Sequence, residues 1–415
     1  MVNHQPLLSR GVKQPGFFYG YIIVLASFLI LLIVAGSLYS FGVFFKPLLN
    51  EFGWTRAATS VPYALFMVLS GFLSIFTGRL CDRFGPRLIV TISGFFIGLS
   101  YLLMATVSTI WQIYLFYGVL LSIGMAGIMV PLPSIVARWF SDRRGLATGI
   151  TLTGAGVGTV IMPPLANQLI LSYSWRMSYV IIGLIALVLI ISFAQFLRRY
   201  PNQKGFFACG TNALITYSPD LPIHDFSPRE ALRTRQFWMI SVAYSISFFC
   251  IQTVMVHVVP YATDIGVPVA AAATILSTIG ILSIGGKIGM GSVGDRIGNK
   301  RAMIIIFFII LLSFLWLNLT SDLWMLYLFA IVFGIAYGGF AAVSSPLVAE
   351  YFGLRAHGII LGLATFALNT GGAIGSLVSG CLFDINSSYY WAFILCAILS
   401  VVGLILTILL KTMRK

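Results

Sequence analysis

Charged residues are scarce in this 415-residue chain: they make up 9% of the sequence, and only 11 residues are Asp or Glu. A soluble globular chain carries about 25% charged residues, so a water-exposed surface cannot be built from this composition. Hydrophobic residues instead reach 59%, and the mean hydropathy is +0.99. Apolar runs of about 20 residues, enough to cross a bilayer, recur along the chain. The composition predicts a polytopic membrane protein and excludes two or three soluble domains.

Metal-binding and signal-peptide patterns are also missing. None of the five cysteines belongs to a CxxC pair or has a histidine at ligand spacing. We therefore expect no metal site, no disulfide framework and no cofactor. The N-terminal segment is polar and leads into an apolar run too long for a cleaved signal peptide, so this run is expected to remain as the first membrane helix.

Twelve apolar segments divide into two groups of six, and the predicted fold class is an all-α membrane protein with two six-helix halves. The spans are expected at 19–46, 57–78, 87–108, 111–139, 145–171, 176–198, 238–262, 268–292, 302–319, 323–350, 357–384 and 389–411. The chain is expected to begin with a cytoplasmic tail (1–18) and a first six-helix half (19–198). A cytoplasmic linker with a short amphipathic piece (199–236) then leads to the second half (237–411) and a cytoplasmic tail (412–415).

The basic residues predict the orientation. The chain has 25 Lys and Arg and a net charge of +14, but they flank apolar runs, so the expected partner is the bilayer and not nucleic acid. With both termini inside, Lys46, Arg56 and Arg176 fall outside and Lys287 lies within the membrane. The other 21 fall in cytoplasmic segments, as the positive-inside rule requires. We expect a multi-pass protein of the cell inner membrane with cytoplasmic termini, working as a monomer.

The two halves repeat one another at a displacement of 213 residues. A GxxxDRxGxx[RK] element begins at Gly78 and again at Gly291. The same displacement relates WxxYLF at Trp111 and Trp324, and it carries three further pairs into register: Pro133 with Pro346, Gly145 with Gly358, and Gly149 with Gly362. Such agreement indicates a duplicated six-helix unit.

This duplicated architecture and its repeated motif resemble the major facilitator superfamily over the whole chain. The resemblance implies alternating access around a substrate site near the membrane midplane, between the halves. The charged motif residues are expected to hold the two halves together at the cytoplasmic face. Their carboxylates would lie near helix N-termini and near arginine side chains. These residues are Asp82, Arg83, Arg87, Asp295 and Arg296. The alternative is that these charged residues only reflect the positive-inside rule and have no role in joining the halves.

Several longer segments resemble one branch of that family, the bacterial monocarboxylate transporters and the oxalate:formate antiporters. They are FFYGYIIV, YSFGVFFKPLLNEFGWTRA, RWFSDRRGLATGITLTGAGVG, REALRTRQFWM and VHVVPYATDIGV. The resemblance implies a small organic anion as substrate, such as lactate, pyruvate, acetate, formate or oxalate.

Lys287 supports an anionic substrate independently. It lies within the eighth span, eight residues before Asp295, or about 12 Å along a helix, which exceeds the reach of its stem to the membrane surface. No acid within the membrane is available to pair with it. An intramembrane charge without a partner is costly and usually marks a transport pathway. The alternative is a lysine that points into a water-filled vestibule for structural reasons.

The family resemblance agrees with this position and differs in the residue. Monocarboxylate transporters carry an arginine there, which binds the substrate carboxylate, and animal members carry an Asp one turn earlier, where this chain has Ser283. The oxalate exchangers add a lysine in the eleventh span, which has none here. A single cation favours a monoanion over a dianion.

His257 lies near the outer end of the seventh span, three residues before Pro260. Imidazole titrates near neutral pH, so it could relay a proton or receive substrate. Alternatively, it hydrogen-bonds a carbonyl that Pro260 leaves without a donor.

Further cavity candidates come mainly from the resemblance. Leu152, Phe366 and Tyr390 match positions that contact substrate in bacterial relatives, and Tyr39, Tyr337 and Asn369 are polar groups on helices that line such cavities. Packing is the competing interpretation for each of them.

The predicted function is uptake of small monocarboxylates by proton-coupled symport, with Lys287 binding the carboxylate. An organic-anion exchanger of the oxalate and formate type is the alternative, and a proton-linked drug or sugar carrier is a weaker one. An enzyme is not expected, because the sequence has no HExxH or paired carboxylate pattern.

Overall fold

The computed structural model describes residues 18–54, 56–140, 143–200, 226–320 and 322–411. Most of the expected N-terminal tail, the middle of the expected linker and residues 412–415 lie outside these ranges. Twelve helices or helix groups in the described part are long and apolar enough to cross a membrane, as the sequence predicts. The described residues contain no strand, so the all-α fold class is confirmed.

The first half contains six spans. The first three spans are α1 (Gly20–Tyr39), which continues into α2 (Phe41–Phe52), then α3 (Arg56–Phe84) and α4 (Pro86–Met104). The fourth span is a group of four short elements: α5 (Ile110–Ile113), η1 (Tyr114–Leu120), α6 (Leu121–Met129) and α7 (Pro131–Trp139). The fifth and sixth spans are α8 (Arg144–Ser172) and α9 (Trp175–Ala194). The second half follows the short α10 (Pro228–Arg233). It comprises α11 (Arg235–Asp264), α12 (Val269–Ile297), α13 (Asn299–Leu317), α14 (Leu323–Phe352), α15 (His357–Asn386) and α16 (Tyr390–Leu409).

The fourth span is less regular than its repeat. It contains the π-helical turn η1 and restarts at Pro131, which cannot donate a backbone hydrogen bond. Its counterpart α14 runs as one helix through Pro346. The duplication therefore preserves the path of the span but not its backbone hydrogen bonding.

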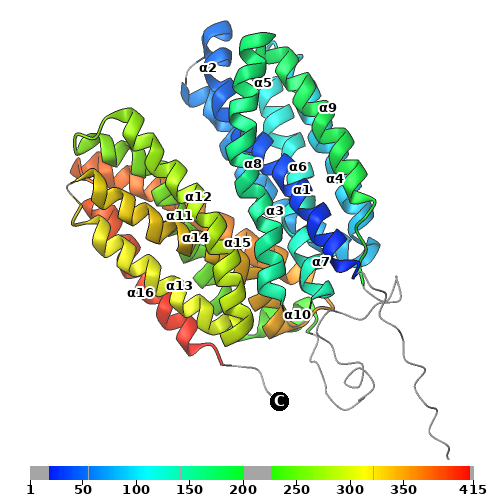
Figure 1. Ribbon diagram of the computed structural model, residues 1–415, viewed down its shortest axis with the longest axis vertical. Helices are drawn as coiled ribbons and strands as arrows, with labels where there is room; N and C mark the ends of the chain where they lie inside the picture. The colour runs from blue at the N-terminus through cyan, green and yellow to red at the C-terminus, as the bar shows by residue number, and fades with distance from the viewer. Residues whose placement is uncertain (1–17, 55, 141–142, 201–225, 321, 412–415) are drawn as a thin grey trace, which may run out of the picture.

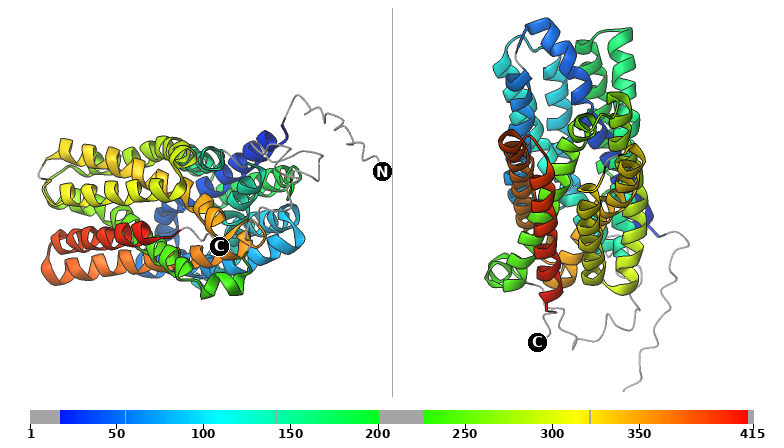
Figure 2. Two further views of the ribbon diagram at one scale, coloured as in Figure 1. Left: turned by 90° about the horizontal axis from the view of Figure 1, so that it is seen from below. Right: turned by 90° about the vertical axis from the view of Figure 1, so that its left-hand side faces the viewer.

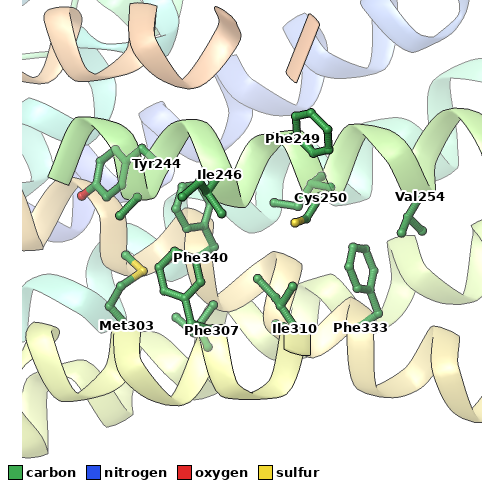
Figure 3. Close-up of a cluster of buried hydrophobic side chains, with 14 of the residues drawn as sticks. Tyr244, Ile246, Phe249, Cys250, Val254, Met303, Phe307, Ile310, Phe333 and Phe340 are labelled. Carbon is green, nitrogen blue, oxygen red and sulfur yellow. The ribbon is translucent and has the colours of Figure 1, made fainter. Parts of the chain in front are cut away.

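Neighbouring helices repeat between the halves. In the first half α1 packs on α8, α3 on α6 and α4 on α9; in the second, α11 packs on α15, α12 on α14 and α13 on α16. The first half has its own buried apolar core, and the second half has another. Figure 3 shows part of the second core, where Tyr244 and Cys250 of α11 face Phe307 of α13 and Phe333 of α14.

The two halves form a V. Their ribbons diverge at the end where α2 lies and converge at the end where α1 begins and α16 ends (Figure 1). We call these the open end and the closed end. Seen from below, at the closed end, the two halves lie side by side (Figure 2, left). Two helix pairs, α8 with α12 and α3 with α15, carry most of the contact between them.

Candidate functional site

The crossing of α8 and α12 is built on glycines that let the two backbones touch. A methyl group on Gly145 would overlap the carbonyl of Gly291, and one on Gly149 would overlap the carbonyl of Lys287. Small residues at such positions permit close helix packing. This crossing fixes the backbone of Lys287 against the opposite half.

The Lys287 side chain extends from that crossing toward the open end. A Cβ on Gly156, two turns further along α8 than Gly149, would lie 3.5 Å from the Lys287 Nζ. Helical side chains lean toward their N-terminus, and α12 begins at the open end. The ammonium therefore points away from Asp295 and the closed end, and does not reach toward the membrane surface there.

Lys287 is 6% exposed, and none of the described residues forms an ion pair or hydrogen bond with its ammonium. The hydroxyl of Ser283, one turn earlier, donates to the carbonyl of Gly280 in its own helix at 2.7 Å. The nearest aromatic partner is Tyr337 of α14, whose ring centroid lies 5.9 Å from Nζ. Tyr39 of α1, in the opposite half, lies near Tyr337. Lys287, Tyr337 and Tyr39 thus form one cluster.

The crossing of α3 and α15 is the repeat of this crossing, but it contains no lysine. Gly362 there corresponds to Gly149, and a methyl group on it would press on the carbonyl of Ser74, which corresponds to Lys287. The Ser74 hydroxyl donates to the carbonyls of Gly71 and Gly362 at 2.6 and 3.2 Å. The same helix crossing forms with a serine, so packing does not require the charge of Lys287.

The α3–α15 crossing also contains two of the predicted residues. The rings of Phe366 and Phe72 meet at a centroid distance of 6.4 Å, and a Cβ on Gly71 would lie 2.9 Å from the Asn369 amide nitrogen. Leu152 lies on α8 between Gly149 and Gly156 and packs partly against the first core. Phe366 and Asn369 thus lie at the α3–α15 crossing, whereas Lys287 and Leu152 lie at the α8–α12 crossing.

His257 is bound within the second half. Its Nε2 donates to the carbonyl of Ser376 on α15 at 3.0 Å, and its Nδ1 lies 3.2 Å from the Tyr389 hydroxyl. The hypothesis that it bonds a carbonyl freed by Pro260 is wrong, because α15 supplies the carbonyl. Tyr390, the predicted candidate, is 50% exposed beside Trp391, whereas its neighbour Tyr389 is buried.

Two carboxylates join the halves at the closed end. Asp82 of α3 accepts hydrogen bonds from the backbone N–H groups of Gly358 and Ile359 at 3.3 and 3.0 Å, in the first turn of α15. Asp295 of α12 accepts from Gly145 and Leu146 at 2.6 and 2.8 Å, in the first turn of α8. A helix N-terminus presents unpaired N–H groups and a partial positive charge, so each carboxylate complements it.

The motif arginines do not take part in these contacts. Arg83 lies over the ring of Phe84, and the Arg87 Nε donates to Gln195 at 2.7 Å within the first half. Arg296 is exposed. The arginine that pairs with Asp82 is Arg138 of α7, which also donates to the carbonyl of Leu354 at 3.2 Å.

Sequence reasoning missed Arg138 and a second buried contact across the halves. His357 of α15 is fully buried, with its Nε2 donating to the Ser345 carbonyl at 3.1 Å and its Nδ1 2.9 Å from the Ser134 hydroxyl on α7. A signal was available for Arg138, which lies inside the fourth predicted span. Nothing in the sequence pairs Ser134 with His357.

Two six-helix halves joined at one end around a buried cation define a membrane transporter and not an enzyme. The sequence profile of the Major Facilitator Superfamily matches residues 27–315 and 240–415. The chain belongs to this family.

Curated relatives are similar over nearly the whole chain. The oxalate:formate antiporter of Oxalobacter formigenes is 26% identical, over 97% of this chain and 93% of its own. Monocarboxylate transporter 13 of Rattus norvegicus is 27% identical, over 92% and 86%. Monocarboxylate transporter 4 of Mus musculus is 29% identical, over 93% and 82%.

Solved structures share the fold at low identity. The proton:xylose symporter XylE superposes with a TM-score of 0.77 at 15% identity, covering 93% of this chain and 94% of its own. The transporter FucP in its outward conformation gives 0.71 at 15% identity, covering 93% and 97%.

Proposed function

We propose that this transporter carries small monocarboxylates and that Lys287 binds the carboxylate. The observation that carries the proposal is a buried ammonium without an ionic partner, at an inter-half crossing whose repeat forms with serine. A bound carboxylate would supply a charge-assisted hydrogen bond at this position. Relatives named as monocarboxylate transporters and as an oxalate:formate antiporter support an organic acid as substrate.

The rest of the cluster suits a short monoanion. Tyr39 and Tyr337 can donate hydrogen bonds to a bound carboxylate, while Leu152 on the facing helix offers an apolar contact for a short alkyl group. A single cation neutralises one negative charge, so a dianion would leave one buried charge unpaired. This favours lactate, pyruvate or acetate over oxalate.

We further propose that Lys287 couples transport to protons. A lysine, unlike an arginine, can lose its proton inside a protein. If the proton and the anion leave together, the empty carrier has a neutral site and can reorient, which gives symport. If the lysine stays charged, the empty carrier retains a buried charge and reorients only when reloaded, which gives exchange.

We also propose that the closed end faces the cytoplasm. Arg83, Arg138, Arg144 and Lys300 all lie there, and cytoplasmic ends of membrane proteins carry an excess of basic residues. In this orientation the structure represents an outward-facing state. Single cysteines replacing Asp264 and Ser227 in a cysteine-free background test it: an impermeant maleimide should label the first from outside and not the second. The reverse labelling would refute the orientation.

Uptake by proteoliposomes tests the function itself. Labelled lactate, pyruvate, acetate, formate and oxalate are each offered to loaded and empty vesicles, with and without an inward proton gradient, and protein-free vesicles serve as the control. We expect saturable monocarboxylate uptake that the proton gradient drives in empty vesicles. Uptake that requires an internal anion and ignores the gradient would replace symport with exchange. No uptake of any carboxylate would reject the substrate class.

A further inference from the structure

Four arginines gather in one pocket on the first half, at the closed end. The pocket has a volume of about 490 Å³ and is lined by Arg83, Phe84, Gly85, Pro86, Arg87, Leu197, Arg198 and Arg199. None of these lining residues is acidic. Such a concentration of guanidinium groups attracts an anion, and the planar guanidinium suits phosphate oxygens in particular.

Helix ends place this pocket at the depth of lipid headgroups. The second candidate span ends at Phe84, the third begins at Pro86, and the sixth ends at Ala194. The pocket is therefore formed where three membrane helices meet the aqueous boundary. Basic pockets between membrane helices at this depth are suited to anionic lipid headgroups.

Two of the arginines are held in place by their own half. The Arg87 Nε donates to the Gln195 side chain at 2.7 Å. One terminal nitrogen of Arg198 donates to the carbonyls of Gln195 and Leu197 at 2.7 and 2.9 Å. A guanidinium carries five N–H donors, so these contacts orient Arg87 and Arg198 and still leave donors for a ligand.

An apolar stripe extends from the pocket along the membrane. Leu88, Ile92 and Phe95 of α4 are exposed and recur at the spacing of one helix face. Phe84, which lines the pocket, is 54% exposed. A free phosphate would make no use of this stripe, whereas the acyl chain of a lipid can cover it.

We propose that this pocket binds the phosphate of an anionic glycerophospholipid whose acyl chain lies along the α4 stripe. The proposal gives Arg83 and Arg87 a role in lipid binding, apart from the contacts that join the halves. It does not depend on which substrate the protein transports.

Lipid binding to the purified full-length protein tests the proposal. Phosphatidylglycerol, phosphatidylcholine and inorganic phosphate are titrated separately, and bound lipid is counted by native mass spectrometry beside the thermal unfolding midpoint. The test variant is Arg83→Gln with Arg87→Gln. The matched control is Arg296→Gln with Lys300→Gln, which removes the same charge from the repeated motif of the second half.

We expect phosphatidylglycerol to be retained and to stabilise the protein, and phosphatidylcholine to do so much less. The test variant should bind phosphatidylglycerol about twenty-five-fold more weakly, since each of the two basic groups near an anionic headgroup contributes about fivefold. The control should bind like the wild type. If the double variant does not fold, Arg83→Gln alone should weaken binding about fivefold. This single variant should fold, because within the described residues the only interaction of the Arg83 guanidinium is with the Phe84 ring.

Three results would overturn the proposal. Equal weakening in the control pair would indicate general attraction by the basic end. Equal retention of phosphatidylcholine would remove the role of the anionic headgroup. Stabilisation by inorganic phosphate as strong as by phosphatidylglycerol would show that the pocket binds free phosphate and not a lipid.

Discussion

Asp82 and Asp295 each bind the first turn of a helix in the opposite half, so the two halves hold one another by a reciprocal pair of carboxylates. The two aspartates differ in one respect. Asp82 also pairs with the buried Arg138, whereas Asp295 relies on the helix N-terminus of α8. This difference predicts that equivalent substitutions in the two repeats have unequal effects.

Asp82→Asn should destabilise the protein more than Asp295→Asn. The first leaves the buried Arg138 without its carboxylate, which costs about 3–5 kcal/mol. The second removes a favourable charge at a helix N-terminus, worth about 1 kcal/mol, and should shift the population toward opening of the closed end about fivefold. Thermal unfolding and spin-label distances across the closed end measure both effects. Equal unfolding midpoints would contradict the role of Arg138.

Much of this architecture could be predicted from the sequence. The twelve spans follow from apolar runs, and the displacement of 213 residues predicts that Asp82 and Asp295 occupy equivalent positions. Lys287 could be identified because it is an isolated charge within an apolar span. These features depend on local composition and on internal repetition, both of which a single sequence contains.

The remaining contacts could not be predicted, because they depend on how helices far apart in the sequence pack against one another. Arg138 is marked by its position inside the fourth expected span, but its ion pair with Asp82 forms only when α7 packs beside α3. Ser134 and His357 are 223 residues apart, and no repeat relates them. The family resemblance predicts Tyr390 as a site residue, but the adjacent Tyr389 makes the contact with His257.

Ser134→Ala should loosen the closed end without disturbing either core. It removes the hydrogen bond to His357 that crosses the halves, a loss of about 1 kcal/mol and about fivefold in population. Cysteine accessibility at the closed end reports the shift. Ser313→Ala is the control, since that buried hydroxyl donates to the Ile309 carbonyl of its own helix and bonds no other residue in the described ranges. If both variants behave alike, the Ser134 contact does not hold the halves.

Gly149→Ala should separate α8 from α12 and lower the unfolding midpoint, because the added methyl group overlaps the Lys287 carbonyl. Gly285→Ala is the matched control: a Cβ there meets no atom within 4 Å, and replacing a helical glycine stabilises by up to about 1 kcal/mol. We expect opposite signs in a thermal unfolding assay. A Gly149→Ala protein as stable as Gly285→Ala would refute the close crossing.

Glu51 predicts a small dependence of stability on pH at the open end. Hydrogen bonds from Trp175 and Arg176 hold the pKa of the Glu51 carboxyl below its usual value. Because the folded pKa is lowered, the stabilisation is present above the unfolded pKa of about 4.3 and is lost as the pH falls through the folded pKa. Both side chains of the ion pair are 40% exposed, so the effect should stay below about 1 kcal/mol.

The check is thermal unfolding of wild type and Glu51→Gln over a pH series. The variant should be slightly less stable at neutral pH, and the difference should vanish in acid. A difference that persists below the folded pKa would show that the carboxylate charge is not its source.

Lys287→Arg separates carboxylate binding from proton coupling. Arginine keeps the positive charge and can bind a carboxylate, but it does not release its proton. The variant should therefore retain exchange between internal and external substrate and lose net uptake driven by a proton gradient. Proteoliposomes loaded with and without substrate measure both modes. Undiminished proton-driven uptake would show that another group carries the proton.

Calorimetric titration of a transported monocarboxylate into wild type and Lys287→Gln tests the central claim most directly. The substitution removes a buried charge that packing does not require, so the variant should fold normally. It also removes a charge-assisted hydrogen bond worth about 1.5–3 kcal/mol, so the affinity should fall about ten- to a hundredfold. An unchanged affinity in folded Lys287→Gln would contradict the assignment of Lys287 as the carboxylate site.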